Sequence, residues 1–111
     1  MDKKNTNTEA FLVLTTVSTR DKALELSREL LGKRLAACVN FREVTSQYWW
    51  NEQINLSQEY ELLVKTDSAH LKGLIEAMKY LHNYDLPEVI YWPIKATNEY
   101  IQWINKSCEG N

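Results

Sequence analysis

Apolar and polar residues along this chain follow a strand pattern in some segments and a helical period in others. The places where the pattern changes predict the secondary-structure elements. Residues 11–17 form a continuous apolar and β-branched run, which is typical of a strand buried on both faces. Residues 36–50, 59–66 and 88–92 predict three further strands. The strand over 36–50 would span about 50 Å at roughly 3.3 Å per residue, so it either bends or extends beyond its own subunit.

The segments between and after these strands have a helical period. Ser18 begins a capping-box-like turn, and the helix after it carries one apolar arc: Ala23, Leu24, Leu26, Leu30 and Leu31. Asp67 or Ser68 caps a second helix, whose apolar face also carries His82 in its final turn. A third helix covers residues 98–107. The order βαββαβ plus a terminal helix predicts an α+β, ferredoxin-like sandwich with a long hairpin between its second and third strands.

Side chains alternate along a strand, so each strand divides into two faces. The apolar sets belong under the two central helices. Five side chains of the opposite parity share the helix-free face: Cys38, Asn40, Glu59, Glu61 and Lys65. Leu63 and the aromatic run Tyr48-Trp49-Trp50 accompany them, and large exposed apolar patches mark interfaces. We therefore expect self-association with closed symmetry.

Composition and charge narrow the function classes. The chain has 111 residues, and we expect a single domain over residues 10–111 behind a flexible polar tail, residues 1–9. Its net charge is −2 without a basic block, which argues against binding nucleic acid or an anionic membrane. No apolar run reaches the roughly 18 residues that a membrane span needs. The polar start and only two cysteines, Cys38 and Cys108, predict a reduced, cytoplasmic protein.

A set of motifs follows in order along the chain. They are Arg34-Leu35-Ala36-Ala37-Cys38-Val39-Asn40, Tyr48-Trp49-Trp50, Glu59 with Leu62, Lys65-Thr66, His82-Asn83-Tyr84-Asp85-Leu86-Pro87-Glu88 and Tyr100-Ile101-Gln102-Trp103. As a set they resemble the CutA divalent-cation tolerance proteins. The resemblance implies a homotrimer whose long hairpins complete sheets between subunits, similar to the PII signalling proteins, and a link to copper and other divalent cations. The chain departs from the family at Glu52, where CutA proteins usually carry Gly.

The resemblance puts the candidate site at the subunit boundary. The residues expected to line an inter-subunit ligand cleft are Cys38, Asn40, Trp50, Glu59, Lys65, His82, Tyr84 and Glu88. Cys38 and His82 are candidate metal ligands because thiolate and imidazole suit copper and zinc, and the alternatives are a packed thiol and an interface histidine. The chain has no CxxC and no closely spaced His pair, so a metal site would be assembled across subunits.

Two further interpretations concern charged side chains. Glu59 and Lys65 are expected to form a structural ion pair at subunit contacts. The alternative is a Lys65 that attracts an anionic ligand or pairs with Glu88. His70 is expected to be a solvated residue in the first turn of its helix.

We therefore expect a homotrimer that is not an enzyme and binds copper, another divalent cation or a small effector between subunits, with no organic cofactor. Three alternatives stay open. One is a PII-like sensor for which metal is incidental, and another is a structural scaffold that binds a partner. The third is a Cys38–His82 nucleophile and base, although no oxyanion hole is visible for it.

Overall fold

The computed structural model describes residues 9–82 and 84–109, so the expected tail lies outside the described residues except for Glu9. Seven elements follow one another: β1 (Ala10–Val17), α1 (Arg20–Gly32), β2 (Cys38–Trp50), β3 (Gln53–Asp67), α2 (Leu71–Leu81), β4 (Ile90–Ile94) and α3 (Asn98–Glu109). The α+β order predicted from the two periods is confirmed. None of the helices in these ranges is long and apolar enough to cross a membrane.

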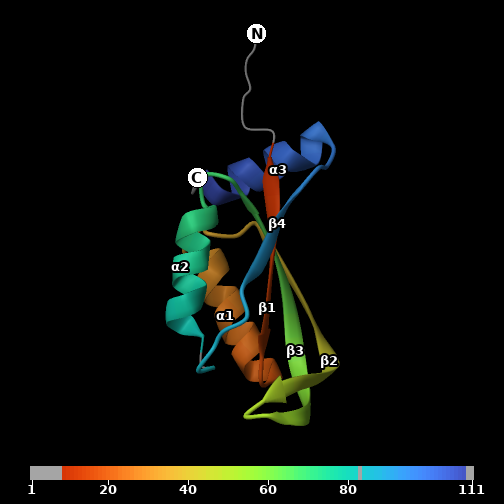
Figure 1. Ribbon diagram of the computed structural model, residues 1–111. Coiled ribbons are helices and arrows are strands. Elements are labelled where there is room, and N and C mark those ends of the chain that lie inside the picture. The colour runs from red at the N-terminus through yellow and green to blue at the C-terminus, as the bar shows by residue number, and fades with distance from the viewer. Residues whose placement is uncertain (1–8, 83, 110–111) are drawn as a thin grey trace.

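The strands form one antiparallel sheet in the order β2-β3-β1-β4. Helices α1 and α2 cover one face of this sheet, and α3 lies across one of its ends (Figure 1). The core under α1 and α2 is made of aliphatic side chains with no exposed surface: Val13, Leu30, Leu62, Val64, Leu74 and Met78. A second cluster of Ala10, Ile101 and Ile104 fixes α3 against the sheet.

The start of α1 differs from the expected one by a residue. Thr19, rather than Ser18, is the N-cap, and its hydroxyl accepts a hydrogen bond from the backbone N–H of Lys22 at 3.1 Å. This contact satisfies one of the N–H groups that a helix start leaves unpaired. At the other end, Leu31 was expected on the buried arc but is 39% exposed, whereas its neighbour Leu30 is fully buried.

Both ends of α2 also differ from the expected ones. The helix begins at Leu71, because Asp67 Oδ1 accepts the backbone N–H of His70 at 2.9 Å and first closes a turn there. His82 has an extended backbone just after the helix, rather than a place in its final turn.

The β2–β3 pairing confirms the expected division of side chains between the two faces. Cys38 lies opposite Lys65 and Asn40 lies opposite Leu63, so all four share the face that α1 and α2 leave open. The hairpin is longer than its apolar pattern predicts, since β3 begins at Gln53 and runs for 15 residues. The backbone ladder against β2 holds the polar segment 53–58 in the strand.

A two-residue turn connects β2 to β3 without glycine. Asn51 has φ 53° and Glu52 has φ 62°, so both residues adopt the left-handed conformation of a type I′ turn. Asn tolerates this conformation, whereas Glu is strained in it because its Cβ crowds the backbone.

Replacing Glu52 with Gly is therefore expected to stabilise the protein. Relief of the left-handed strain at residue 52 stabilises the folded state, and the extra freedom of Gly in the unfolded chain offsets part of this effect. The free energy of unfolding should therefore rise by about 0.5–1 kcal/mol. Urea unfolding at one fixed protein concentration measures this gain. Glu52→Ala is the matched control, since it removes the same carboxylate and keeps the Cβ. An equal gain in both variants would show that charge, not backbone strain, limits the turn.

Candidate functional site

Within one subunit, the residues predicted to line a cleft between subunits lie in two separate places. Cys38, Asn40 and Lys65 lie at the end of the sheet near α3. The others, Trp50, Glu59, His82, Tyr84 and Glu88, lie toward the hairpin tip. Glu59 and Lys65 share a face of β3 but are six residues apart, which is about 20 Å along a strand. They do not pair within one subunit, and each has a different partner.

Lys65 is held by α3 rather than by a carboxylate. Its Nζ donates to the hydroxyl of Tyr100 at 3.3 Å and lies 5.6 Å from the centre of the same ring. Its cross-strand neighbour Cys38 is partly exposed, and the Cys38 thiol lies 3.9 Å from Asn40 Oδ1. This end of the sheet offers one thiol and one ammonium group, and within the described ranges Cys38 belongs to no group of three metal-ligating side chains.

A hollow of about 790 Å³ lies between the hairpin, the end of β1 and the segment before β4. The far end of the hairpin bends across below β1 (Figure 1), and residues 46–50 and 57–59 of the hairpin line the hollow. Its walls are aromatic and acidic: Tyr48, Trp49, Trp50 and Tyr84, with Glu59, Asp85 and Glu88. The remaining lining is mostly small and polar. No lysine, arginine or histidine belongs to the described lining.

Tyr84 and Glu59 form the central contact of this hollow. The Tyr84 hydroxyl donates to Glu59 Oε2 at 2.7 Å, and Glu59 is only 7% exposed. Burial, the hydrogen bond to Glu59 and the negative charges nearby raise the pKa of Tyr84 far above its usual value, because all three oppose a phenolate. Glu88 is held in a similar way, by a hydrogen bond of 3.1 Å from the Thr16 hydroxyl.

His82 fastens the start of the same segment. The backbone N–H of Tyr84 donates to His82 Nδ1 at 3.1 Å, so Nδ1 is the unprotonated nitrogen and Nε2–H donates to the Thr16 carbonyl at 2.7 Å. The imidazole also packs edge-on against the Tyr84 ring, with 4.8 Å between centroids. Both ring nitrogens are therefore occupied within the subunit. This makes His82 a structural anchor of the hollow.

A cluster of three metal-ligating side chains lies at the other end of the molecule, beside α3. Ligand atoms of Asp67, His70 and Cys108 all lie within 4.8 Å of one another. His70 Nδ1 is 2.7 Å from Asp67 Oδ1, and the His70 side chain is 32% exposed while that of Asp67 is 4% exposed. His70 is thus half-buried and paired, rather than solvated as expected. Within the described parts of the chain this is the only such group of three.

Helix α3 carries Cys108 to this cluster. Its buried residues Ile101 and Ile104 pack on the sheet, and Arg34 Nη1 donates to the Ser107 carbonyl at 2.9 Å, which holds the end of the helix. Burial raises the pKa of the Cys108 thiol, and the charge of Asp67 acts in the same direction. The spacing of Asp67 and His70 was visible in the sequence, but only the packing of α3 reveals the third member.

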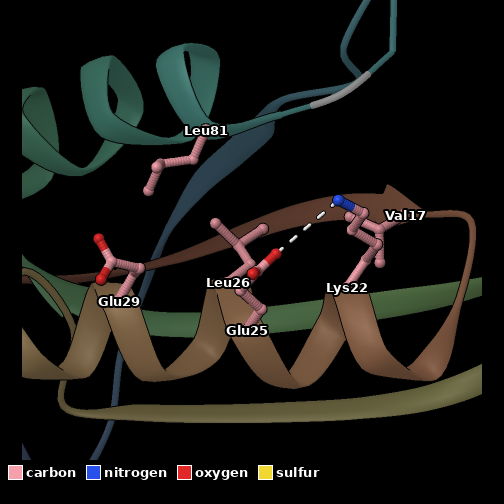
Figure 2. A pocket seen from close by; sticks show the side chains of 6 residues that line it. All are labelled: Val17, Lys22, Glu25, Leu26, Glu29 and Leu81. Carbon is pink, nitrogen blue, oxygen red and sulfur yellow. Dashed lines mark ion pairs between the residues drawn. The ribbon is translucent and has the colours of Figure 1, made fainter.

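A second, smaller hollow of about 300 Å³ lies between α1 and the C-terminal end of α2 (Figure 2). It is lined by Val17, Lys22, Glu25, Leu26, Glu29 and Leu81. Its charged groups pair with neighbours on α1 or at its C-cap, since Lys22 Nζ is 3.9 Å from Glu25 and Glu29 is 3.7 Å from the C-cap residue Lys33. This hollow therefore presents no converging set of polar atoms to a ligand.

Comparison with known proteins gives one consistent result. A family model described as CutA1 divalent ion tolerance protein matches residues 11–107. The Divalent-cation tolerance protein CutA of Thermotoga maritima is 37% identical over 97 residues, which cover 86% of this chain and 96% of that protein. The chloroplastic Protein CutA 1 of Oryza sativa is 35% identical over 96% of this chain, which spans 62% of that longer protein. The solved structure of CutA from Synechococcus elongatus superimposes with a TM-score of 0.88 at 31% identity, covering 92% of both chains.

The raised pKa of Tyr84 predicts a loss of stability at high pH. The folded state retains the phenol proton above pH 10, whereas the unfolded chain releases it near the usual tyrosine pKa of 10.0. The contribution of the protonated Tyr84 phenol to the free energy of unfolding is therefore complete below pH 10 and is lost as the pH rises further. Urea unfolding from pH 9 to 11 should show a steeper loss for the wild type than for Tyr84→Phe. Tyr80→Phe, at a side chain that is 87% exposed, is the control. Equal slopes for wild type and Tyr84→Phe would refute this account.

Proposed function

Because this chain belongs to the CutA1 divalent ion tolerance family, we propose that it binds divalent cations and that Asp67, His70 and Cys108 form the binding site. The observation that carries the proposal is the approach of three ligand atoms of different kinds to within 4.8 Å. The site binds the cation as cargo or as a signal, not as a catalytic cofactor. This binding would be the metal-dependent step of a cation-tolerance function.

The donor set fits a borderline or soft metal ion. A thiolate and an imidazole favour zinc and copper over magnesium or calcium, and a carboxylate completes three protein ligands. At metal–ligand bonds of about 2.0–2.3 Å, ligand atoms around a tetrahedral ion lie about 3.3–3.8 Å apart. The His70–Asp67 pair, at 2.7 Å, therefore has to open by about 1 Å, and separations near the upper limit of 4.8 Å have to contract by about 1 Å. Three ligands leave a fourth position open, and the partly exposed His70 provides the way in.

We further propose that the protein is a cytoplasmic homotrimer of ferredoxin-like subunits and is not an enzyme. The edge strand β2 presents 13 residues whose outer backbone groups have no strand beside them in the described subunit, and such edges pair with other chains. At the hairpin tip Trp49, Ile54 and Leu56 are 71%, 63% and 67% exposed. A trimer would cover these side chains and place clefts along β2, which carries Cys38.

Two observations support the remaining parts of this proposal. The thiols of Cys38 and Cys108 are free, as expected in a reducing compartment. A Cys38–His82 catalytic pair is disfavoured, because His82 binds Thr16, and Thr16 and Cys38 lie opposite Glu61 and Lys65. Those two positions are four residues apart on β3, about 13 Å along the strand.

The metal site is tested by adding Co²⁺ to the reduced protein and recording absorption. Wild type should show a thiolate-to-cobalt charge-transfer band that saturates at one ion per chain and disappears on adding Zn²⁺. Cys108→Ser should abolish the band. His70→Gln should keep the thiolate but weaken binding by more than the roughly 10–100-fold that loss of an outer-shell partner causes.

Cys38→Ser is the matched control, since it removes the other thiol and should leave the band unchanged. His70 is partly exposed, so His70→Gln tests the site even where the buried Cys108 variant fails to fold. A band that persists in Cys108→Ser, or that is lost in Cys38→Ser, would show that the cation binds at another site.

The assembly is tested by light scattering after size exclusion. Wild type should have three times the mass of the chain, and Ile54→Glu with Leu56→Glu should shift it toward the monomer, because the exposed apolar tip would carry charge. Tyr80→Glu, on the exposed side of α2, should remain a trimer. A wild-type monomer at micromolar concentration would refute the trimer.

A further inference from the structure

A strained residue connects the end of α1 to the start of β2. Arg34 has φ 60°, which is the left-handed conformation that favours glycine. Its backbone N–H donates to the Leu31 carbonyl at 3.1 Å, and the N–H of Leu35 donates to the Leu30 carbonyl at 3.0 Å. These two bonds form a Schellman motif, whose left-handed position is usually occupied by glycine. An arginine in this position strains the backbone, and such strain points to a task for the side chain.

The Arg34 side chain reaches the C-terminal end of α3. Its Nη1 donates to the carbonyl of Ser107 at 2.9 Å. Ser107 lies in the last turn of α3, where the backbone carbonyls have no partner within the helix. A cationic donor is also favourable at this end because of the helix dipole. The contact therefore holds the last turn of α3, and the next residue along the chain is Cys108 of the proposed metal site.

A buried contact connects the same loop to Cys108 from the side of the sheet. The Thr66 hydroxyl donates to the Leu35 carbonyl at 2.8 Å and lies 3.9 Å from the Cys108 sulfur. Thr66 has no exposed surface, and Cys108 is 1% exposed. The residues that follow α1 thus contact both the helix and the strand that carry the cluster. All of these contacts lie within one subunit, so they do not depend on how subunits assemble.

We infer that Arg34 is a positioning residue for metal binding, because it holds the last turn of α3 so that Cys108 stays beside Asp67 and His70. This inference rests on the proposed function of that cluster. Asp67 and His70 are held in one turn, since Asp67 Oδ1 accepts the backbone N–H of His70 at 2.9 Å. Cys108 comes from a separate helix, one residue before its end, and helix ends fray. A metal site loses affinity when the groups that support its ligands are removed.

The inference is tested in a Cys38→Ser background, in which Cys108 is the only remaining thiol. Arg34→Gly removes the hydrogen bond but relieves the left-handed backbone, so Co²⁺ binding should weaken by about tenfold while stability to urea changes little. In the metal-free protein, N-ethylmaleimide should alkylate Cys108 faster, because the buried thiol reacts when the end of α3 opens. Arg34→Lys keeps a cationic donor and should bind Co²⁺ more tightly than Arg34→Gly. Lys33→Ala removes the neighbouring cation, which pairs with Glu29, and is the matched control that should behave as the background does.

The outcomes that overturn this inference differ from those that overturn the proposed function. An unchanged Co²⁺ affinity in Arg34→Gly, beside a band that depends on Cys108, would refute the role of Arg34 and leave the metal site standing. An equal loss of affinity in Lys33→Ala, or in Arg34→Lys and Arg34→Gly alike, would also refute it, as would a loss of stability as large as the loss of affinity. Absence of any Cys108-dependent band would refute the proposed function and this inference with it. The alkylation rates need no metal and report separately on whether Arg34 holds the end of α3.

Discussion

The pairing of β2 with β3 is the constraint on which the arrangement of this molecule depends. The two strands stay in register from Cys38 opposite Lys65 to Trp50 opposite Gln53, and a turn of two residues sets that register. A slip by one residue would turn Glu59 and Lys65 toward α1 and α2 and would turn Leu62 and Val64 outward. The buried side chains of β3 make such a slip too costly. The register thereby fixes which polar groups face the hollow and which face α3.

The two ends of the sheet have different chemistry for reasons that lie in the elements around them. At one end α3 brings Cys108 to Asp67 and His70 and gives Lys65 an aromatic partner in Tyr100. At the other end none of the described helices covers the open face, and the bent hairpin borders a space lined with carboxylates and indole rings.

Much of the fold followed from local pattern, whereas the composition of the sites did not. Alternation correctly divided β2 and β3 into two faces, because Leu62 and Val64 had to be buried. Shared parity put Glu59 and Lys65 on one face, but a face of a 15-residue strand is long enough to separate them within one subunit, so only subunit contacts could bring them together. His70 was expected to be solvated because its contacts do not show in the local sequence pattern. Asp67 binds it in a turn that precedes α2, and α3 brings Cys108 close to it. Contacts of that kind depend on tertiary packing, which no local window contains.

Thr16 has a consequence beyond its own contacts. Its carbonyl accepts from His82 and its hydroxyl donates to Glu88, so one residue of an inner strand ties down both ends of the segment that walls the hollow. Whatever packs against this wall, including a neighbouring copy of the chain, therefore meets side chains that are already held in place, so contact costs little conformational entropy.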